Sequence, residues 1–227
     1  QYQDAQILDI GAGGGDHLKW VAKKNLKNVT LTGIDSSEAM LNITRKRLGV
    51  KLSEGVRLLH KNVHDDDIFM SSSFSHITCY YFTMYQLNAK KVLASVRDWL
   101  RPGGWFVVHL VDLYKFDPVL DASSPFVGTS LQRYVKSRIT ESKVHFKKFI
   151  YEANFTLANK KNTKHAYFDE AFHFKKKPII RKHQHKLNVF TVDEFIDKMT
   201  RLKFELKHTT TLAHLNYPFQ YVLYFQK

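Results

Sequence analysis

The first half of the chain alternates between two hydrophobic periods. Short apolar runs rich in β-branched residues predict strands, and stretches with apolar residues three or four positions apart predict helices. The expected strands are the run that ends near Asp9, then 29–34, 57–61, 76–82 and 105–111. The expected helices are 16–25, one that begins near Ser36, and 90–100. Strands that alternate with helices predict an α/β fold with a mostly parallel sheet.

The second half has a different pattern. Residues 130–142 have a helical pattern, and 143–157, 164–175 and 179–189 predict three antiparallel strands. Thr191 with Glu194 three positions later predicts a capped helix start. Residues 203–209 and 217–226 then predict a last pair of strands. We therefore expect a single domain over residues 1–227, with an insertion at about 113–189.

Composition limits the classes of protein that remain. The chain has 227 residues, 44% hydrophobic and 14% aromatic, which is enough to bury one core. The single cysteine, Cys79, excludes an internal disulfide and fits a reducing compartment. No apolar run reaches about 18 residues and no signal-peptide pattern is present, so we expect a soluble cytoplasmic protein without a membrane partner. Because the first strand follows Gln1 almost at once, we also expect the chain to be part of a longer protein.

The positive charge lies mainly in the second half. Residues 1–112 have 14 Lys or Arg against 11 Asp or Glu, whereas residues 113–227 have 21 against 10. Such a surface attracts an anionic partner, either RNA or a small anionic substrate, although scattered lysines can also be only a solvated surface. One group of positive residues in this half is expected to form a basic rim. Its members are His173, Lys175, Lys176, Lys177, Arg181, Lys182, His183 and His185.

A glycine-rich turn follows the first strand. Gly11, Gly13, Gly14 and Gly15 give the pattern D-x-G-x-G-x-G from Asp9. Glycine lets the backbone approach a ligand closely, and the helix that follows presents free N–H groups. The dinucleotide fingerprint G-x-G-x-x-G would need glycine where Asp16 stands, which argues against a hydride-transfer cofactor.

Four motifs in this order resemble those of class I S-adenosylmethionine (SAM) dependent methyltransferases. They are the glycine turn, the strand that ends at Asp35, the aromatic stretch after the fourth strand, and Arg101-Pro-Gly-Gly before the fifth. The resemblance implies a Rossmann-like sheet of seven strands with a C-terminal antiparallel hairpin and a β-rich lid insertion, as in small-molecule N-methyltransferases. It also implies SAM as the cofactor, bound by Asp9, Gly11, Ala12, Gly13, Gly15, Asp35, Ser36, Met40, Asn62, Val63 and Tyr80.

Two of these assignments keep alternatives. Asp35 is expected to accept hydrogen bonds from the ribose hydroxyls, but a cap for the next helix fits the same position. Asn62 stands where many relatives have an aspartate that contacts the adenine, and Asp65 is the alternative. Three adjacent carboxylates, 65–67, cannot all point at one ion, and the histidines of the basic rim have no cysteine or paired carboxylate beside them. We expect no metal site.

The resemblance places the methyl-transfer site after the fourth strand, where aromatic rings would stabilise a sulfonium by cation–π contact. The candidate catalytic residues are His109, as base or orienting group, with Tyr80 and Tyr85 lining the site beside Phe82. Each could equally be a core residue. We expect methyl transfer to a nitrogen or oxygen of a small anionic acceptor. The alternatives are an RNA-directed methyltransferase domain and a catalytically silent SAM-binding module, and nothing in the sequence indicates an oligomeric state.

Overall fold

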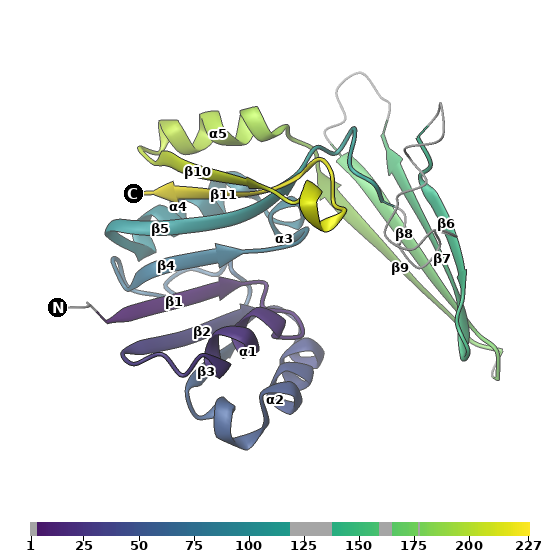
Figure 1. The fold of residues 1–227 in the computed structure, drawn as a ribbon, viewed down its shortest axis with the longest axis horizontal. Helices are drawn as coiled ribbons and strands as arrows, with labels where there is room; N and C mark the ends of the chain where they lie inside the picture. The colour runs from purple at the N-terminus through teal and green to yellow at the C-terminus, as the bar shows by residue number, and fades with distance from the viewer. Residues whose placement is uncertain (1–3, 119–137, 159–164, 177) are drawn as a thin grey trace. The chain divides into compact units, whose positions relative to one another are not determined.

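The computed structural model describes residues 4–118, 138–158, 165–176 and 178–227. In the order of the chain, its elements are β1 Ala5–Ile10, α1 Asp16–Lys23, β2 Val29–Asp35, α2 Glu38–Ser53, β3 Val56–His60, β4 Phe74–Cys79, α3 Thr83–Gln86, α4 Ala89–Trp99, β5 Leu100–Val111, β6 Glu141–His145, β7 Phe149–Leu157, β8 His165–Phe174, β9 Ile180–Asn188, α5 Val192–Arg201, β10 Glu205–Thr211 and β11 Gln220–Gln226 (Figure 1). None of the described helices has the length and hydrophobicity needed to span a bilayer.

A seven-stranded sheet has the order β10-β11-β5-β4-β1-β2-β3. β1 pairs in parallel with both β2 and β4, so the chain moves first to one side of β1 and then to the other. This reversal of direction is the switch point at which open α/β sheets bind ligands, next to the carboxyl ends of the strands. The sequence prediction of a mostly parallel α/β sheet is confirmed.

The last strands form the expected antiparallel hairpin. The Asp112 N–H donates to the Phe219 carbonyl over 2.9 Å, and the Gly103 N–H donates to the Lys227 carbonyl over 3.0 Å, so β11 runs opposite to β5. The Arg101-Pro-Gly-Gly stretch, expected before the fifth strand, lies inside β5. A register irregularity between the β4 residues Phe74 and His76 accommodates it there.

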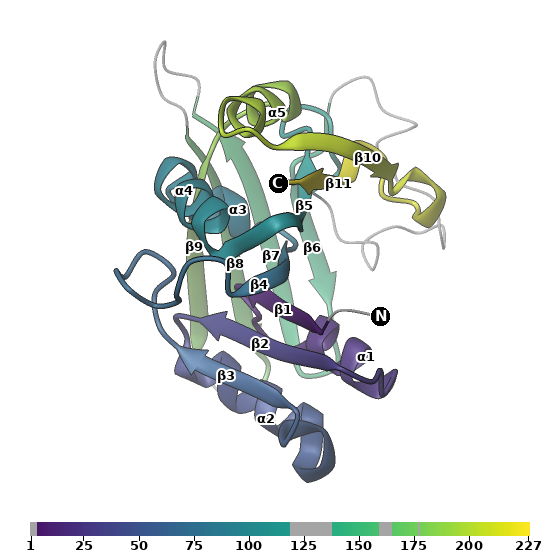
Figure 2. The same ribbon diagram turned by 90° about the vertical axis from the view of Figure 1, so that its left-hand side faces the viewer.

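Helices cover both faces of this sheet. α1 and α2 pack together on one face, where Leu18 and Leu48 meet Leu31 and Val56 of β2 and β3. Figure 2 shows α4 on the other side of the strands from α1. Gly33 is required under α1, because a Cβ there would lie 2.6 Å from a Leu18 methyl group. The α1 backbone can therefore lie close to β2.

The capped start of α5 is confirmed. The Glu194 N–H donates to the Thr191 hydroxyl over 3.1 Å, and the Thr191 N–H donates to the Glu194 carboxylate over 2.8 Å. These reciprocal bonds form a capping box, which satisfies two N–H groups at the helix start.

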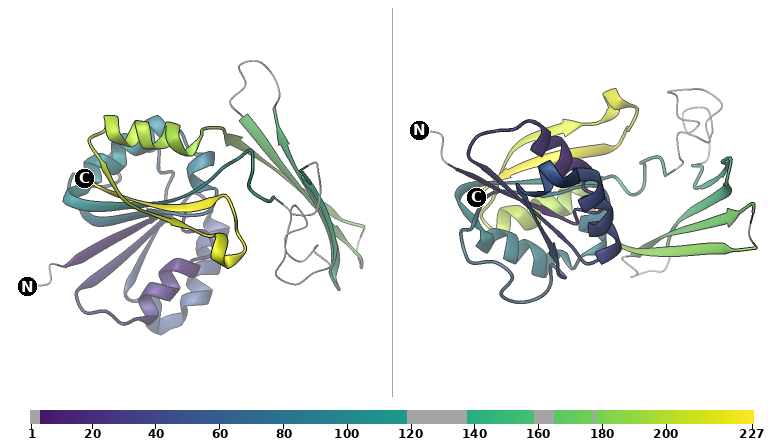
Figure 3. Two further views of the ribbon diagram at one scale, coloured as in Figure 1. Left: turned by 45° about the horizontal axis from the view of Figure 1, so that its top comes forward. Right: turned by 90° about the horizontal axis from the view of Figure 1, so that it is seen from below.

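The chain divides into two compact units, which are described separately. The first is Gln1–Leu110 with Ile196–Thr209 and Val222–Lys227, and the second is Val111–Phe195 with Thr210–Tyr221. The second unit holds an antiparallel sheet with the order β6-β7-β8-β9 (Figure 3). One face of this sheet is apolar, with Val144, Tyr151 and Ala153 buried against four phenylalanines.

The sequence prediction for this sheet was wrong in two respects. The span 143–157, expected as one strand, is the hairpin of β6 and β7, so the sheet has four strands and not three. Its turn holds Lys147 and Lys148, which have no turn preference that the pattern could reveal. The helix expected over 130–142 fails at its end, because β6 already begins at Glu141. The rest of that helix, 130–137, lies outside the described residues.

Candidate functional site

The glycine turn after β1 adopts conformations that side chains disfavour. Gly11, Gly13 and Gly15 have φ of 69°, 51° and 76°, in the left-handed region. The Gly11 N–H donates to the Ile34 carbonyl over 2.9 Å, which ties the turn to the end of β2. A Cβ on Gly13 would have only the Gly11 carbonyl nearby, at 3.8 Å, so this glycine faces open space. The turn therefore leaves room for a ligand beside the carboxyl end of β1.

Asp35 at the end of β2 holds this turn. Its Oδ2 accepts from the Gly13 N–H and its Oδ1 from the Ser37 N–H, each over 2.8 Å. The cap of α2 is Ser37, whose hydroxyl accepts from the Met40 N–H over 3.4 Å, so Asp35 supports the approach to the helix without capping it. An ionised carboxylate accepts up to about four hydrogen bonds, so Asp35 keeps capacity for two hydroxyls. Binding of ribose by Asp35 stays a prediction.

Asp9 at the end of β1 is a buried carboxylate with one oxygen unused. The side chain is 3% exposed, its Oδ1 accepts from the Thr78 hydroxyl over 2.8 Å, and within the described residues its Oδ2 has no partner. Burial raises the pKa of Asp9 to about 7, and nearby Asp35 acts in the same direction, whereas the bond from Thr78 opposes them. A buried acceptor without a partner is costly, so this oxygen is suited to a ligand group that carries N–H bonds or positive charge.

The predicted adenine contacts lie on two loops of the same sheet edge. Asn62 follows β3, and its side-chain oxygen accepts from the His64 N–H over 3.0 Å, while Asp65 accepts from the Asn62 N–H over 3.1 Å. Val63 between them is buried, and Met40 in the first turn of α2 is 43% exposed. Ser36 is exposed, and its carbonyl accepts from His60 over 3.1 Å. The adenine assignments to Asn62 or Asp65 stay predictions.

Two histidines, on α1 and β5, lie beside two tyrosines that follow β4. The buried His109 binds the Tyr81 carbonyl through Nδ1 over 3.1 Å, and a carbonyl can only accept, so Nδ1 carries the proton. The lone pair of the neutral ring is then on Nε2, which is the atom a base would use. His17, in the first turn of α1, contacts the Tyr80 ring, with centroids 4.3 Å apart and ring planes tilted by 39°.

His17 was missed by the sequence interpretation. Its ring lies 5.6 Å from that of Tyr81, and burial lowers its pKa, with Asp16 opposing and His109 acting in the same direction. A neutral imidazole is therefore favoured beside Tyr80. The signal for His17 was its place in the first helical turn after the glycine turn, because that turn lies at the strand ends.

The three predicted catalytic residues have different environments. Burial raises the pKa of Tyr80 to about 12, with Asp9 acting in the same direction, so the phenol stays protonated at neutral pH. Tyr85 on α3 is fully buried and packs near Phe82, with centroids 6.0 Å apart, which is a core environment. A catalytic role for Tyr85 gains no support from this position, whereas Tyr80 and His109 lie beside the other polar rings.

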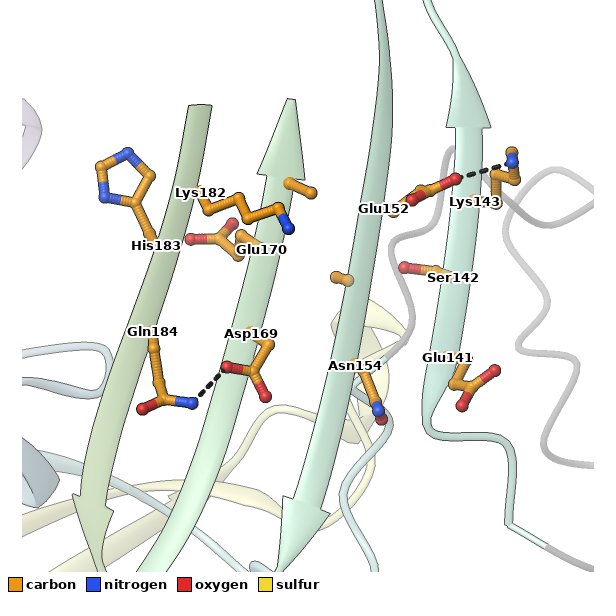
Figure 4. A pocket seen from close by; sticks show the side chains of 12 residues that line it. Glu141, Ser142, Lys143, Glu152, Asn154, Asp169, Glu170, Lys182, His183 and Gln184 are labelled. Carbon is orange, nitrogen blue, oxygen red and sulfur yellow. Dashed lines mark hydrogen bonds and ion pairs between the residues drawn. The ribbon is translucent and has the colours of Figure 1, made fainter. Parts of the chain in front are cut away.

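The four-stranded sheet carries a polar pocket that is lined by residues of all four strands (Figure 4). Lys143 Nζ lies 2.6 Å from a Glu152 oxygen, and the Gln184 amide donates to Asp169 over 2.7 Å. The hydrogen bond from Lys143 lowers the pKa of Glu152. The pocket therefore holds side chains of both charge signs, of which Lys143 and Glu152 pair with each other.

The three histidines of the expected basic rim do not form one cluster, although the His183 and His185 rings stack with centroids 6.3 Å apart. His173 binds Glu152 and His185 binds Glu170, each over 3.0 Å, on opposite faces of the four-stranded sheet. Lys177, also assigned to that rim, lies outside the described residues. The remaining lysines lie at the hairpin turns and on β9.

The fold and the glycine turn are similar to those of class I SAM-dependent methyltransferases. Residues 7–104 match the family model described as a methyltransferase domain. The solved structure of an S-adenosylmethionine-dependent methyltransferase from Clostridium acetobutylicum superimposes with a TM-score of 0.70 at 14% identity, covering 98% of this chain and 84% of that one. A SAM-bound amino pentose methyltransferase from Micromonospora echinaspora gives 0.62 at 19% identity, covering 97% and 83%.

A curated relative gives a match at higher sequence identity over a shorter span. An EEF1A lysine methyltransferase 2 from Danio rerio is 31% identical over 146 residues, which is 54% of this chain and 59% of the relative. The chain spans about half the length of the curated relatives it matches. The resemblance to class I methyltransferases that the motifs indicated is confirmed, and SAM is the cofactor of this class.

The residues on the sheet edge fit this cofactor. The turn leaves room for the cofactor to lie next to the Gly13 backbone. Asp35 keeps acceptor capacity for two ribose hydroxyls, and the unused Asp9 oxygen suits an ammonium group. All three lie at the carboxyl ends of β1 and β2. We therefore take the strand ends around these residues as the candidate cofactor site.

Proposed function

We propose that this domain transfers a methyl group from SAM to an amine nitrogen or a hydroxyl oxygen of a small molecule. The observation that carries the proposal is His109, whose Nδ1 is fixed as a donor by the Tyr81 carbonyl, so that Nε2 is the basic atom. The amino pentose methyltransferase, which matches over 97% of this chain, supports a small acceptor. The excess of Lys and Arg over residues 113–227 favours an acceptor with an anionic group.

The reaction requires little proton transfer by the side chains of the protein. SAM supplies an electrophilic methyl group on a positively charged sulfur, and the acceptor must be aligned with it in a site that excludes water. His109 would take a proton from the acceptor, either an ammonium proton that blocks the nucleophilic lone pair or a hydroxyl proton. The Tyr80 hydroxyl, which stays protonated, would donate a hydrogen bond and keep an oxygen or nitrogen in place. His17 would keep the Tyr80 ring in position through its ring contact.

The test is methyl transfer from radiolabelled SAM to pooled small amines, hydroxy acids and amino sugars. We expect incorporation into at least one pool, and a fall of roughly 10²- to 10⁴-fold in kcat for His109→Gln, because general base catalysis contributes that much. SAM binding measured by calorimetry should be unchanged in this variant. His76→Gln is the matched control, because His76 is a partly buried histidine on β4, bound to Ser75.

Two results would contradict the proposal. Binding of SAM without transfer to any pool would indicate a silent SAM-binding module. Full activity of His109→Gln with the identified acceptor would remove His109 from the reaction while leaving the small-molecule activity in place.

A further inference from the structure

The two turns of the four-stranded sheet lie side by side at one end. Phe149 at the start of β7 pairs with Phe174 at the end of β8, and the Lys175 N–H donates to the Lys148 carbonyl over 3.1 Å. Figures 1 and 3 show both turns at the same end of this sheet. We call residues 146–149, 174–176 and 178–181 the hairpin tip.

The hairpin tip exposes apolar side chains. Phe174, Ile179 and Ile180 are 40%, 51% and 54% exposed. The Phe149 ring packs against Phe146 and Phe174, with ring centroids 4.9 Å and 5.9 Å apart. The Phe149 and Phe174 rings meet across the two turns, and the Phe174 N–H donates to the Ile179 carbonyl, whereas Ile180 pairs with His173 and so lies on the opposite face of the sheet. Apolar side chains that are exposed together at one end of the sheet are more than the scattered exposure that folded proteins normally show.

Four exposed lysines, Lys147, Lys148, Lys175 and Lys176, flank these apolar side chains. The sequence has no Asp or Glu in 144–150 or in 172–182. In the part of the chain that the structure describes, no carboxylate pairs with any of the four. The lysine stems are long enough to let an ammonium group stay in a polar layer while the apolar side chains are buried.

This combination favours a lipid surface over a nucleic acid. Single strands bind to open aromatic faces on which bases stack, whereas the rings of Phe146, Phe149 and Phe174 pack on one another. Within the hairpin tip, the two most exposed apolar side chains are Ile179 and Ile180. Both are aliphatic and have no ring on which a base could stack. Aliphatic groups that enter the boundary of a bilayer, with lysines above them, give binding that depends on anionic lipid.

In place of the sequence expectation of no membrane partner, we propose that the hairpin tip docks the protein onto a membrane surface that contains anionic lipid. Ile179, Ile180 and Phe174 enter the headgroup boundary, and the four lysines contact lipid phosphates and carboxylates. The hairpin tip shares no residue with the proposed methyl-transfer site, and the proposal does not depend on the identity of the acceptor.

Sedimentation with vesicles tests this proposal. We expect the protein to bind vesicles of phosphatidylcholine mixed with phosphatidylserine and to leave vesicles of phosphatidylcholine alone in solution. Changing the four lysines together to glutamine should weaken binding on the order of a hundredfold or more, since each lysine near an anionic surface contributes about fivefold. Ile179→Ser with Ile180→Ser should weaken binding by about tenfold, through loss of apolar burial.

Matched variants separate the surface from general charge and hydrophobicity. Changing Lys23, Lys27, Lys46 and Lys51 to glutamine removes the same charge from exposed positions on and beside α1 and α2, and it should lower vesicle binding far less. Val50→Ser with Met70→Ser removes two side chains that are 81% and 83% exposed elsewhere, and it should change nothing. Melting temperatures near wild type would show that every variant folds.

Three results would overturn the proposal. The first is equal binding to both kinds of vesicle, and the second is wild-type binding by both hairpin-tip variants. The third is binding of single-stranded RNA, without vesicle binding, that is lost in the lysine variant and kept in the isoleucine variant. That outcome would assign the hairpin tip to a nucleic acid.

Discussion

At the scale of single residues, the site is defined by two carboxylates with different environments. Asp35 accepts two backbone N–H groups at 2.8 Å, so its charge is stabilised before any ligand binds. Asp9 has one hydroxyl bond and an oxygen without a partner in the described residues, so its charge is poorly stabilised. An aspartate carboxylate is therefore well supplied with hydrogen-bond donors at the end of β2 and poorly supplied at the end of the neighbouring strand β1.

Asp35→Ala should weaken SAM binding by roughly 30- to 1000-fold, because charge-assisted hydrogen bonds to both ribose hydroxyls are lost. Titration calorimetry measures the change, and Glu54→Ala, at an exposed position, is the control. Since Asp35 also holds the glycine turn, the melting temperature without SAM should be measured for both variants. Wild-type affinity in Asp35→Ala would place the ribose elsewhere.

Asp9 predicts a pH dependence with a definite sign. Its pKa is raised from 3.8 to about 7, so between these values the native state binds more protons than the unfolded state, and stability from this group falls as pH rises. Without SAM, the free energy of unfolding of wild type should drop by a few kcal/mol relative to Asp9→Asn between these two pH values. Denaturant melts at several pH values measure this difference.

The affinity for SAM should change in the opposite direction. If the ionised Asp9 accepts from an ammonium group, binding should tighten as pH rises through about 7, and this trend should be absent in Asp9→Asn. If the free energies of unfolding of wild type and Asp9→Asn change in parallel with pH, Asp9 titrates at its ordinary pKa.

At the scale of elements, the turn between β1 and α1 depends on glycine for two separate reasons. Gly11 has φ of 69°, and a Cβ there would overlap the Thr83 side chain of α3. Gly49 within α2 has the same φ of 69° with nothing within 4 Å of a Cβ. The two positions thus separate backbone strain from a steric clash.

Gly49→Ala should cost about 1 to 3 kcal/mol of stability, because φ of 69° with ψ of 175° is a conformation that is essentially limited to glycine. Gly11→Ala should cost about 1 to 3 kcal/mol more, because the methyl group overlaps Thr83. Adding Thr83→Ala to Gly11→Ala should recover most of that extra loss. Equal costs in urea melts for the two alanine variants would show that α3 moves aside without penalty.

At the scale of the whole molecule, the dominant feature is the formal net charge of +14. Most of this excess comes from residues 113–227, which contain 21 Lys or Arg and 10 Asp or Glu. The four lysines of the hairpin tip have no carboxylate near them in the sequence of either turn. Like charges that lack partners repel one another, so the folded state carries an unfavourable electrostatic term.

Raising NaCl from about 0.02 M to about 0.2 M should therefore raise the melting temperature by a few degrees, because salt screens this repulsion. The variant with glutamine at the four hairpin-tip lysines should show a smaller rise than wild type. Differential scanning fluorimetry measures both. A fall in melting temperature with salt would mean that attractive ion pairs outweigh the repulsion.

The sequence by itself determined the parallel sheet and the cofactor edge. The glycine turn, Asp35 and the capping box at Thr191 are local features, because each depends on backbone conformations and bonds within a few residues or on one strand end. The hydrophobic periods likewise fix which segments are strands and helices. These parts of the fold were predicted close to their observed bounds.

The tertiary structure alone decided which distant residues meet. The His17 ring contacts the Tyr80 ring, and His109 binds the carbonyl of Tyr81, across separations that no local pattern encodes. The burial of Asp9 and the pairing of Phe149 with Phe174 are likewise results of packing and strand register. Burial and proximity are properties of the packed chain, so the raised pKa of Asp9 and the joined hairpin turns could only be found there.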